Sequence, residues 1–149
     1  MEKKKKKLSR SKLVHLLDSV FSQYIRLLYS NPRWYCQCFT CGDYKHRKTM
    51  QNSHFISRGV YKYRRDEENC YPGCYKCNII LHGNYKVYVL RMIDKYGRDK
   101  IDQMINDREI VKISTAEIME KIEHYKLRVI ELEKNIIRDT IYKKIKNGL

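Results

Sequence analysis

CFTC at residues 38–41 and CYKC at residues 74–77 are two Cys-x-x-Cys turns separated by 32 residues. Each turn presents two thiolates together, and four thiolates complete the tetrahedral shell of a structural Zn²⁺ ion. We therefore expect Cys38, Cys41, Cys74 and Cys77 to bind zinc and to hold the intervening chain in place. Four sulfurs leave no reactive position on the metal, so any catalysis must come from other residues.

Two further cysteines, Cys36 and Cys70, lie outside these turns and are expected to be free thiols. An alternative register that uses Cys36 in place of Cys38 remains open. The N-terminal lysine run is followed by a stretch interrupted by His15 and Asp18, which does not fit a secretory signal. No apolar run approaches the roughly 20 residues of a membrane span. The expected location is a reducing cytoplasm, without membrane association.

The segment that the turns enclose carries residue types suited to phosphodiester hydrolysis. His54 is followed by Asn69, Asn78 comes directly after the second turn, and His82 lies four residues further on. A neutral imidazole can deprotonate an attacking water, and a divalent cation can stabilise charge on the scissile phosphate. Residues four apart on a helix project to the same side, so Asn78 and His82 are expected to share that cation.

This order of residues resembles the HNH, or ββα-metal (His-Me finger), nuclease motif. Shorter phrases make the chain look like the lambdoid-phage NinG (Rap) recombination proteins over roughly residues 8 to 135, and the two-knuckle layout is also similar to the phage resolvase endonuclease VII. The phrases are FSQYIR at 21–26, HFISR at 54–58, DEEN at 66–69, CN at 77–78, HGN at 82–84 and KYG at 95–97.

The resemblance implies a structure-specific endonuclease that cleaves branched recombination intermediates such as Holliday junctions and D-loops. It implies His54 as general base, Asn69 as the residue that orients the loop, and Asn78 and His82 as ligands of a catalytic Mg²⁺ or Mn²⁺. The chain departs from many ββα-metal nucleases at Ser53, where an Asp or His metal ligand often stands. Either water fills the metal's coordination shell, or one of three nearby acidic residues reaches it: Asp66, Glu67 or Glu68.

The basic residues predict a nucleic-acid partner. The formal charge is +15, and residues 1–65 hold 16 of the 32 Lys and Arg residues against three acids. Such a surface attracts a polyanion, and aromatic residues among the basic ones can stack on unpaired bases. We expect Arg58 to clamp the substrate phosphate. The full set of expected DNA-binding residues is Lys45, Arg47, Lys48, Arg58, Lys62, Arg64 and Arg65.

The predicted fold is α+β: a zinc-stapled ββα-metal (HNH) nuclease core at 34–97, flanked by an N-terminal helix at 13–31 and a long C-terminal helix. Residues 1–12 form a basic flexible arm and residues 98–149 a helical extension. A hairpin is expected at 55–65, with Gly59 near its turn. Ser114 and Glu117 form a capping box for a helix that reaches about Ile145. That helix either lies across the core or pairs with a second copy, which makes a homodimer possible.

Two other functions fit the same residues. Ser53 in the ligand position would suit a catalytically inactive, zinc-dependent protein that binds DNA or a junction. An HNH endonuclease directed by sequence instead of branch structure would share the motif. Cleavage of a synthetic junction, compared with linear duplex, separates these readings.

Overall fold

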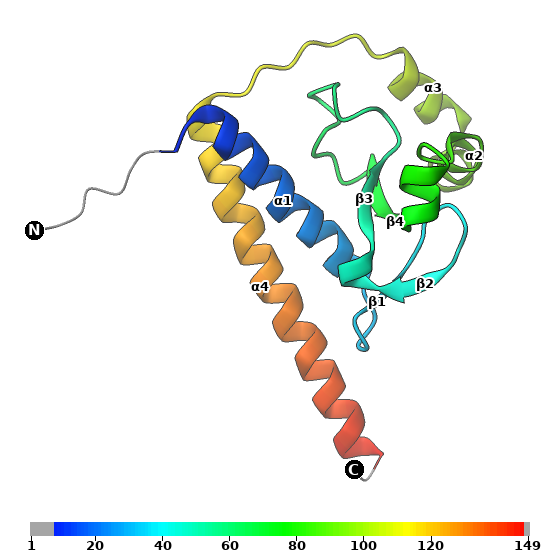
Figure 1. Ribbon diagram of the computed structural model, residues 1–149, viewed down its shortest axis with the longest axis vertical. Coiled ribbons are helices and arrows are strands. Elements are labelled where there is room, and N and C mark those ends of the chain that lie inside the picture. Colours follow the sequence, from blue (N-terminus) through cyan, green and yellow to red (C-terminus); the bar gives the residue numbers. More distant parts are fainter. Residues whose placement is uncertain (1–7, 148–149) are drawn as a thin grey trace, which may run out of the picture.

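The computed structural model describes residues 8–147 and has an α+β fold, in which two small antiparallel sheets lie beside a pair of long helices (Figure 1). The expected arm at 1–12 falls mostly outside the described residues, and its residues 10–12 belong to the first helix. None of the helices within residues 8–147 combines the length and the apolar character that a bilayer crossing requires.

Helices α1 (Arg10–Leu28) and α4 (Thr115–Lys146) run side by side in the same direction (Figure 1). Helix α1 begins and ends three residues earlier than the expected 13–31. It begins at Arg10 because the Ser9 side chain caps it by accepting a hydrogen bond from the Lys12 backbone N–H. Arg10 Nη1 donates to Thr115 Oγ1 at 3.1 Å and joins the starts of the two helices. Both bonds of the predicted capping box at Ser114 are present.

The interface between α1 and α4 is the larger hydrophobic core. Leu17 and Phe21 from α1 meet Ile118 and Tyr125 from α4, and the rings of Phe21 and Tyr125 pack edge to face at 5.0 Å. Each such side chain contributes about 1.5–3 kcal/mol when fully buried. One face of the long C-terminal helix therefore lies against the protein itself.

The two sheets frame the cysteine turns. Strands β1 (Tyr35–Gln37) and β2 (Tyr44–His46) form a hairpin whose loop is the first Cys-x-x-Cys turn. Strand β3 (Gln51–His54) pairs with β4 (Cys70–Gly73), which leads into the second turn. The short π-helix Lys76–Ile80 (η2) follows, and after it Gly83 has a φ of 88°, which suits glycine.

The expected hairpin at 55–65 is wrong. The partner of β3 comes after that stretch, with His54 opposite Cys70, and residues 55–69 form a loop of turns. The reason is the buried Asn69 side chain, which bonds the backbone of Ile56 at both its N–H and its C=O. These backbone groups are then not available for a strand ladder.

A second core supports the β3–β4 ribbon. Helices α2 (Tyr85–Tyr96) and α3 (Arg98–Asn106) meet at Gly97, which has a φ of 84° and ends α2. Tyr88 and Met92 of α2 pack with Phe55 and Tyr71, and the Tyr88 hydroxyl donates to the Ser53 carbonyl at 3.2 Å. The ribbon therefore contacts both α2 and α1.

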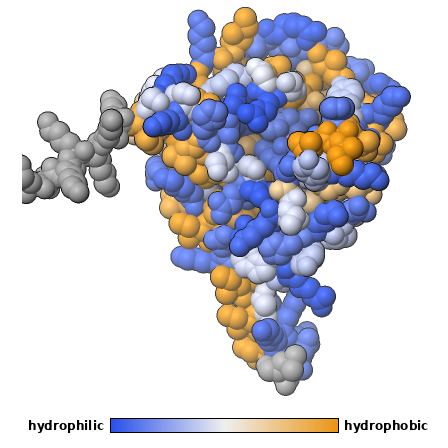
Figure 2. Space-filling view, viewed as in Figure 1, coloured by the Kyte–Doolittle hydropathy of each residue, from blue (hydrophilic) through white to orange (hydrophobic). Residues whose placement is uncertain are grey.

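The far end of α4 extends below the rest of the molecule, and apolar side chains cover one side of it (Figure 2). Three isoleucines there are exposed by about half or more of their surface: Ile137 (49%), Ile141 (52%) and Ile145 (71%). This stripe lies outside the core that α4 forms with α1.

Candidate metal centre and active-site cavity

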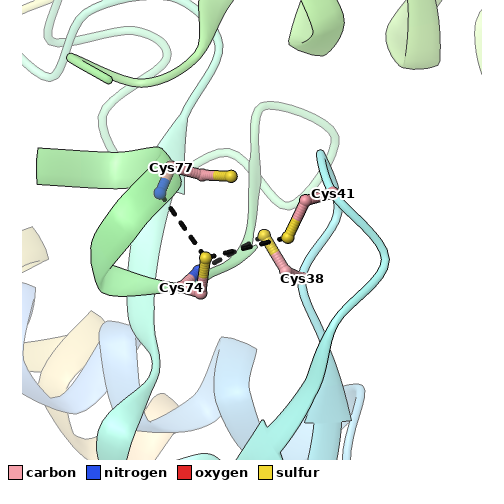
Figure 3. A group of neighbouring side chains, drawn as sticks. All are labelled: Cys38, Cys41, Cys74 and Cys77. Atoms are coloured by element: carbon pink, nitrogen blue, oxygen red, sulfur yellow. Dashed lines mark hydrogen bonds between the residues drawn. The ribbon is translucent and has the colours of Figure 1, made fainter. Parts of the chain in front are cut away.

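The side chains of Cys38, Cys41, Cys74 and Cys77 converge from the two turns (Figure 3). Their sulfur atoms lie within 4.8 Å of one another, and Cys41 Sγ is 3.8 Å from Cys74 Sγ. Zn–S bonds of about 2.3 Å place tetrahedral sulfurs about 3.8 Å apart. The four thiols therefore fit a metal ion such as zinc.

Hydrogen-bond donors surround these sulfurs. The backbone N–H of Cys74 donates to Cys38 Sγ at 3.3 Å, and the Thr40 hydroxyl lies 3.2 Å from the same sulfur. Burial raises the pKa of the Cys38 thiol, but these donors outweigh it and lower the pKa to about 6. Burial instead raises the pKa values of the Cys41 and Cys74 thiols, so Cys38 is the thiol that already favours the thiolate form that binds metal.

The alternative register through Cys36 is not supported. Cys36 lies buried in β1 and takes no part in the four-thiol cluster, which within residues 8–147 contains Cys38 instead. Burial raises the pKa of the Cys36 thiol. Cys70 is also a buried free thiol, as expected for both residues.

A cavity of about 420 Å³ lies between α1, β3 and the start of η2. His54, Arg58 and Asn78, which the sequence placed in one site, all line it. The polar and charged residues that line it also include Asp18, Arg26, Gln51, Asn52 and Arg64.

His54 is half-buried at the end of β3, and its ring is fixed by the loop that follows. Its Nε2 lies 3.0 Å from the Arg64 carbonyl oxygen. Because a carbonyl only accepts, Nε2 carries the proton and Nδ1 keeps a free lone pair. Burial lowers the pKa of the imidazole and the Arg58 charge lowers it further, against opposing contributions from the Arg64 carbonyl and Asp18. The ring is therefore neutral at pH 7 and able to accept a proton.

Asn69 is fully buried and braces the loop that carries the Arg64 carbonyl. Its Oδ1 accepts from the Ile56 N–H at 2.6 Å, and its Nδ2 donates to the carbonyls of Ile56 and Tyr63 at 3.0 and 2.9 Å. One side chain thus fixes both ends of the 56–63 segment.

Asn78 is held against β3 by two side chains. The Ser53 hydroxyl donates to Asn78 Oδ1 at 2.8 Å, and Asn78 Nδ2 donates to Gln51 Oε1 at 2.6 Å. A Cβ atom on Gly73, in the neighbouring strand, would overlap Ser53 Oγ, so only glycine fits there. Ser53 therefore contacts the motif asparagine directly, at the position where related motifs place a metal ligand.

The expected helical relation between Asn78 and His82 is wrong. The helix ends at Ile80, and His82 has a left-handed φ of 48° and an exposed side chain. Asn78 lines the cavity, whereas the lining residues do not include His82.

The three acids considered for the metal shell are also engaged elsewhere. Glu67 accepts from the Tyr24 hydroxyl at 3.0 Å, Glu68 pairs with Lys100, and Asp66 accepts from the Glu68 N–H at 2.8 Å. None of the three lines the cavity.

Asp18 of α1 is the acid that does line the cavity, and sequence reasoning missed it. Its carboxylate pairs with Arg64 at 2.6 Å and with Arg65 at 2.7 Å. Burial raises the pKa of Asp18, but the two arginines outweigh burial and the pKa is lowered. A signal was present: Asp18 is the only acid between Glu2 and Asp43, in an otherwise basic stretch.

The expected DNA-binding residues fall into two groups. Arg47 pairs with Glu133 at 3.1 Å, Lys62 contacts Asp107 and Glu109 at 2.6 Å each, and Arg64 and Arg65 pair with Asp18. Lys45, Lys48 and Arg58 are exposed and form no ion pair within residues 8–147. The structure thus leaves three of the seven expected cations open to a ligand.

Comparison with known proteins places this arrangement in a family. No curated protein and no solved structure matches the chain. A family model does match, under the description Bacteriophage Lambda NinG protein, and it covers residues 1–135, which include both cysteine turns and every residue that lines the cavity. The chain therefore belongs to the NinG family.

Proposed function

We propose that this protein is a metal-dependent DNA endonuclease that cleaves branched recombination intermediates. NinG membership supports a role connected with phage recombination. The observation that carries the proposal is the His54 ring, whose Nε2 is bound to the Arg64 carbonyl in a cavity that Arg58 and Asn78 also line. A neutral, oriented imidazole beside a cation and a fixed amide is a suitable arrangement for phosphodiester hydrolysis.

In this reaction His54 Nδ1 takes a proton from a water molecule. The water oxygen forms a bond to phosphorus, and the bond from phosphorus to the 3′ oxygen breaks. The products are a 5′ phosphate and a 3′ hydroxyl, once the leaving oxygen has taken a proton from solvent. Arg58, exposed at the rim, binds the phosphate, and Asn69 keeps the loop in place so that the ring does not turn.

Oxygen atoms suited to a hard divalent cation belong to residues that line the same cavity. The buried Asn52 Oδ1 has no hydrogen-bond partner within residues 8–147, and Asn78 on η2 supplies a second amide oxygen. Mg²⁺ keeps several waters in protein sites and needs few protein ligands. When bound, the cation stabilises charge on the phosphate and on the leaving oxygen. Asn78 and Asn52 are the ligands that the cavity offers, and Asn78 is the residue that tests the site, because the exposed His82 does not line the cavity.

The zinc-binding thiols have a structural role in this proposal. They join the loop of the β1–β2 hairpin to the start of η2, and η2 carries Asn78. The Phe39 N–H bond to the Pro72 carbonyl and the bonds of Asn78 to Ser53 and Gln51 also connect these segments, and the metal would add a rigid link at the start of η2. Mg²⁺ or Mn²⁺ is then the catalytic ion and Zn²⁺ the structural one.

The test compares a synthetic four-way junction with linear duplex of the same sequence, using the full chain loaded with zinc, with and without Mg²⁺ or Mn²⁺. We expect the junction to be cut only with the cation. His54→Ala should lower the cleavage rate about 10²–10⁴-fold and leave binding unchanged. His124→Ala, at an exposed histidine on α4, is the matched control. Undiminished cleavage by His54→Ala would remove the assigned role.

A binding protein without catalysis is the second candidate. Two observations favour it: Ser53 stands where a metal ligand is expected, and the amide of Asn78 is already bonded on both sides. Under this reading no divalent metal yields nicked product, while band shifts with the junction persist. The comparison above separates the two functions directly.

The outer face of α4 supports a homodimer as part of the same proposal. Leu127, Ile130, Ile137, Ile141 and Ile145 are exposed and recur at spacings of three, four or seven residues, which is the pattern of a helix-pairing seam. Two subunits would supply one active site for each strand of a junction. Sedimentation should give a dimer that Ile141→Glu disrupts, and a monomeric unsubstituted chain would exclude this assembly.

A further inference from the structure

A second hollow, of about 560 Å³, is separate from the cavity that contains His54. The end of α1, the first cysteine turn, β4 and α2 surround it, and the two sets of lining residues have no member in common. Its volume falls within the range of about 300–1,000 Å³ that is usual for small-ligand sites.

Aromatic rings form much of this hollow. Tyr44 and Tyr29 are exposed by 62% and 37%, so their rings are open to a ligand. Phe39 and Tyr71 stack on each other at 4.0 Å with an interplanar angle of 15° and form a rigid wall behind them. Flat rings held in this way stack well on a nucleobase, whatever its identity.

The two Lys or Arg side chains that line the hollow come from α2. Arg91 and Lys95 line it from successive turns of α2, both are exposed, and neither forms an ion pair within residues 8–147. The Lys95 ammonium lies 5.1 Å from the centre of the Tyr71 ring, which places a cation beside the aromatic wall. No acidic residue of the described chain lines the hollow. An aromatic surface with adjacent cations suits a ligand that is both flat and anionic.

We propose that this hollow binds one unstacked nucleotide of a DNA strand, with its base on Tyr44 or Tyr29 and its phosphate on Arg91 or Lys95. Bases within a duplex are stacked and paired, whereas bases at a branch point or in a single strand are accessible. The inference rests on the proposed function only for the choice of DNA as the polymer. It supplies that function with a way to distinguish branched DNA from linear duplex, because bases at a branch point or in a single strand leave the stack at lower cost than bases inside a duplex.

The test measures binding, without any divalent cation, so it does not depend on cleavage. The probe is a 12-nucleotide single strand that carries one 2-aminopurine, whose fluorescence is quenched when it stacks on an aromatic ring. Tyr44→Ala should weaken binding of this strand roughly five- to hundredfold and abolish the quenching, while Tyr44→Phe retains both. Arg91→Ala, on a different element, should weaken binding and leave the quenching of the saturated complex in place.

Two substitutions at exposed positions on α4, Tyr142→Ala and Lys121→Ala, are the matched controls. Tyr44 is mostly exposed on a hairpin edge, so its replacement should leave the fold and the metal content unchanged. The proposal is overturned if Tyr44→Ala binds the single strand within twofold of the unsubstituted chain, or if duplex binding falls by the same factor. Either result leaves the proposed cleavage untouched, and a loss of cleavage in His54→Ala leaves this site untouched.

Discussion

Asp18→Asn tests how the first helix stabilises the cavity that contains His54. The side chains of Asp18, Arg64 and Arg65 are 23%, 16% and 6% exposed, so the pairs are neither open to solvent nor fully enclosed. Exposed pairs contribute at most about 1 kcal/mol, and breaking an enclosed pair costs about 3–5 kcal/mol. We expect the substitution to lower the free energy of unfolding by about 2 kcal/mol at pH 7, between these limits.

The pH dependence gives a sharper expectation. The folded-state pKa of Asp18 is lowered, so the stability it contributes is present above its unfolded pKa of about 3.9 and is lost as the pH falls through the lower folded value. The amide that replaces the carboxylate in Asp18→Asn cannot titrate. The difference in unfolding free energy between the two proteins should therefore be constant above about pH 5 and shrink in more acidic solution.

Urea unfolding of the zinc-loaded chain measures this difference, with the exposed Asp139→Asn on α4 as control. Because the Arg64 carbonyl holds the His54 ring, the cleavage rate should fall as well. The reasoning fails if Asp18→Asn unfolds within about 0.5 kcal/mol of the unsubstituted protein, as ordinary surface substitutions do. It also fails if the difference between the proteins does not change with pH.

Three further results are expected. Asn69→Ala leaves unpaired the buried backbone groups that the Asn69 side chain bonds, so the free energy of unfolding in urea should fall by about 3 kcal/mol. An unchanged urea midpoint would contradict the bracing role of Asn69. Cys38→Ala should lose the bound zinc measured by atomic absorption, while Cys36→Ala keeps it, and the reverse pattern would restore the alternative register. Because the pKa of His54 is lowered, the cleavage rate should stay high just below pH 6.5 and fall only as the pH drops through that lower pKa. Arg58→Ala removes a charge that lowers this pKa, so the midpoint of the rate against pH should move upward. A midpoint above about pH 6.5 in the unsubstituted protein would contradict the assignment of His54 as the base.

Local signals allowed the sequence to predict much of this structure. The capping box of Ser114 and Glu117 and the two Cys-x-x-Cys turns each act over a few residues, and all are present as predicted. In each case the residues that specify the feature also form it.

The errors concern partners that lie far apart in the chain. Nothing near residue 55 indicates that the Asn69 side chain hydrogen-bonds to the Ile56 backbone, so the local sequence predicts a hairpin at 55–65 that does not form. Likewise the pairing of Arg64 with Asp18 spans 46 residues. His82 was misplaced because η2 ends early, and helix ends are set by local backbone competition that spacing does not reveal.

The ion pairs change how the basic half of the chain should be understood. Composition treats every Lys and Arg there as equally available to DNA, but Arg64 and Arg65 are both paired with Asp18 of α1, which cancels one of their two charges. These ion pairs connect the loop at 55–69 to α1, while Arg58, which is exposed on the same loop, remains free to bind a phosphate. Because Asp18 also moderates the positive field on His54, α1 affects both the position and the proton affinity of the proposed base. If His54 is the base as proposed, the catalytic unit includes α1, and the segment between the cysteine turns would not be a sufficient nuclease by itself.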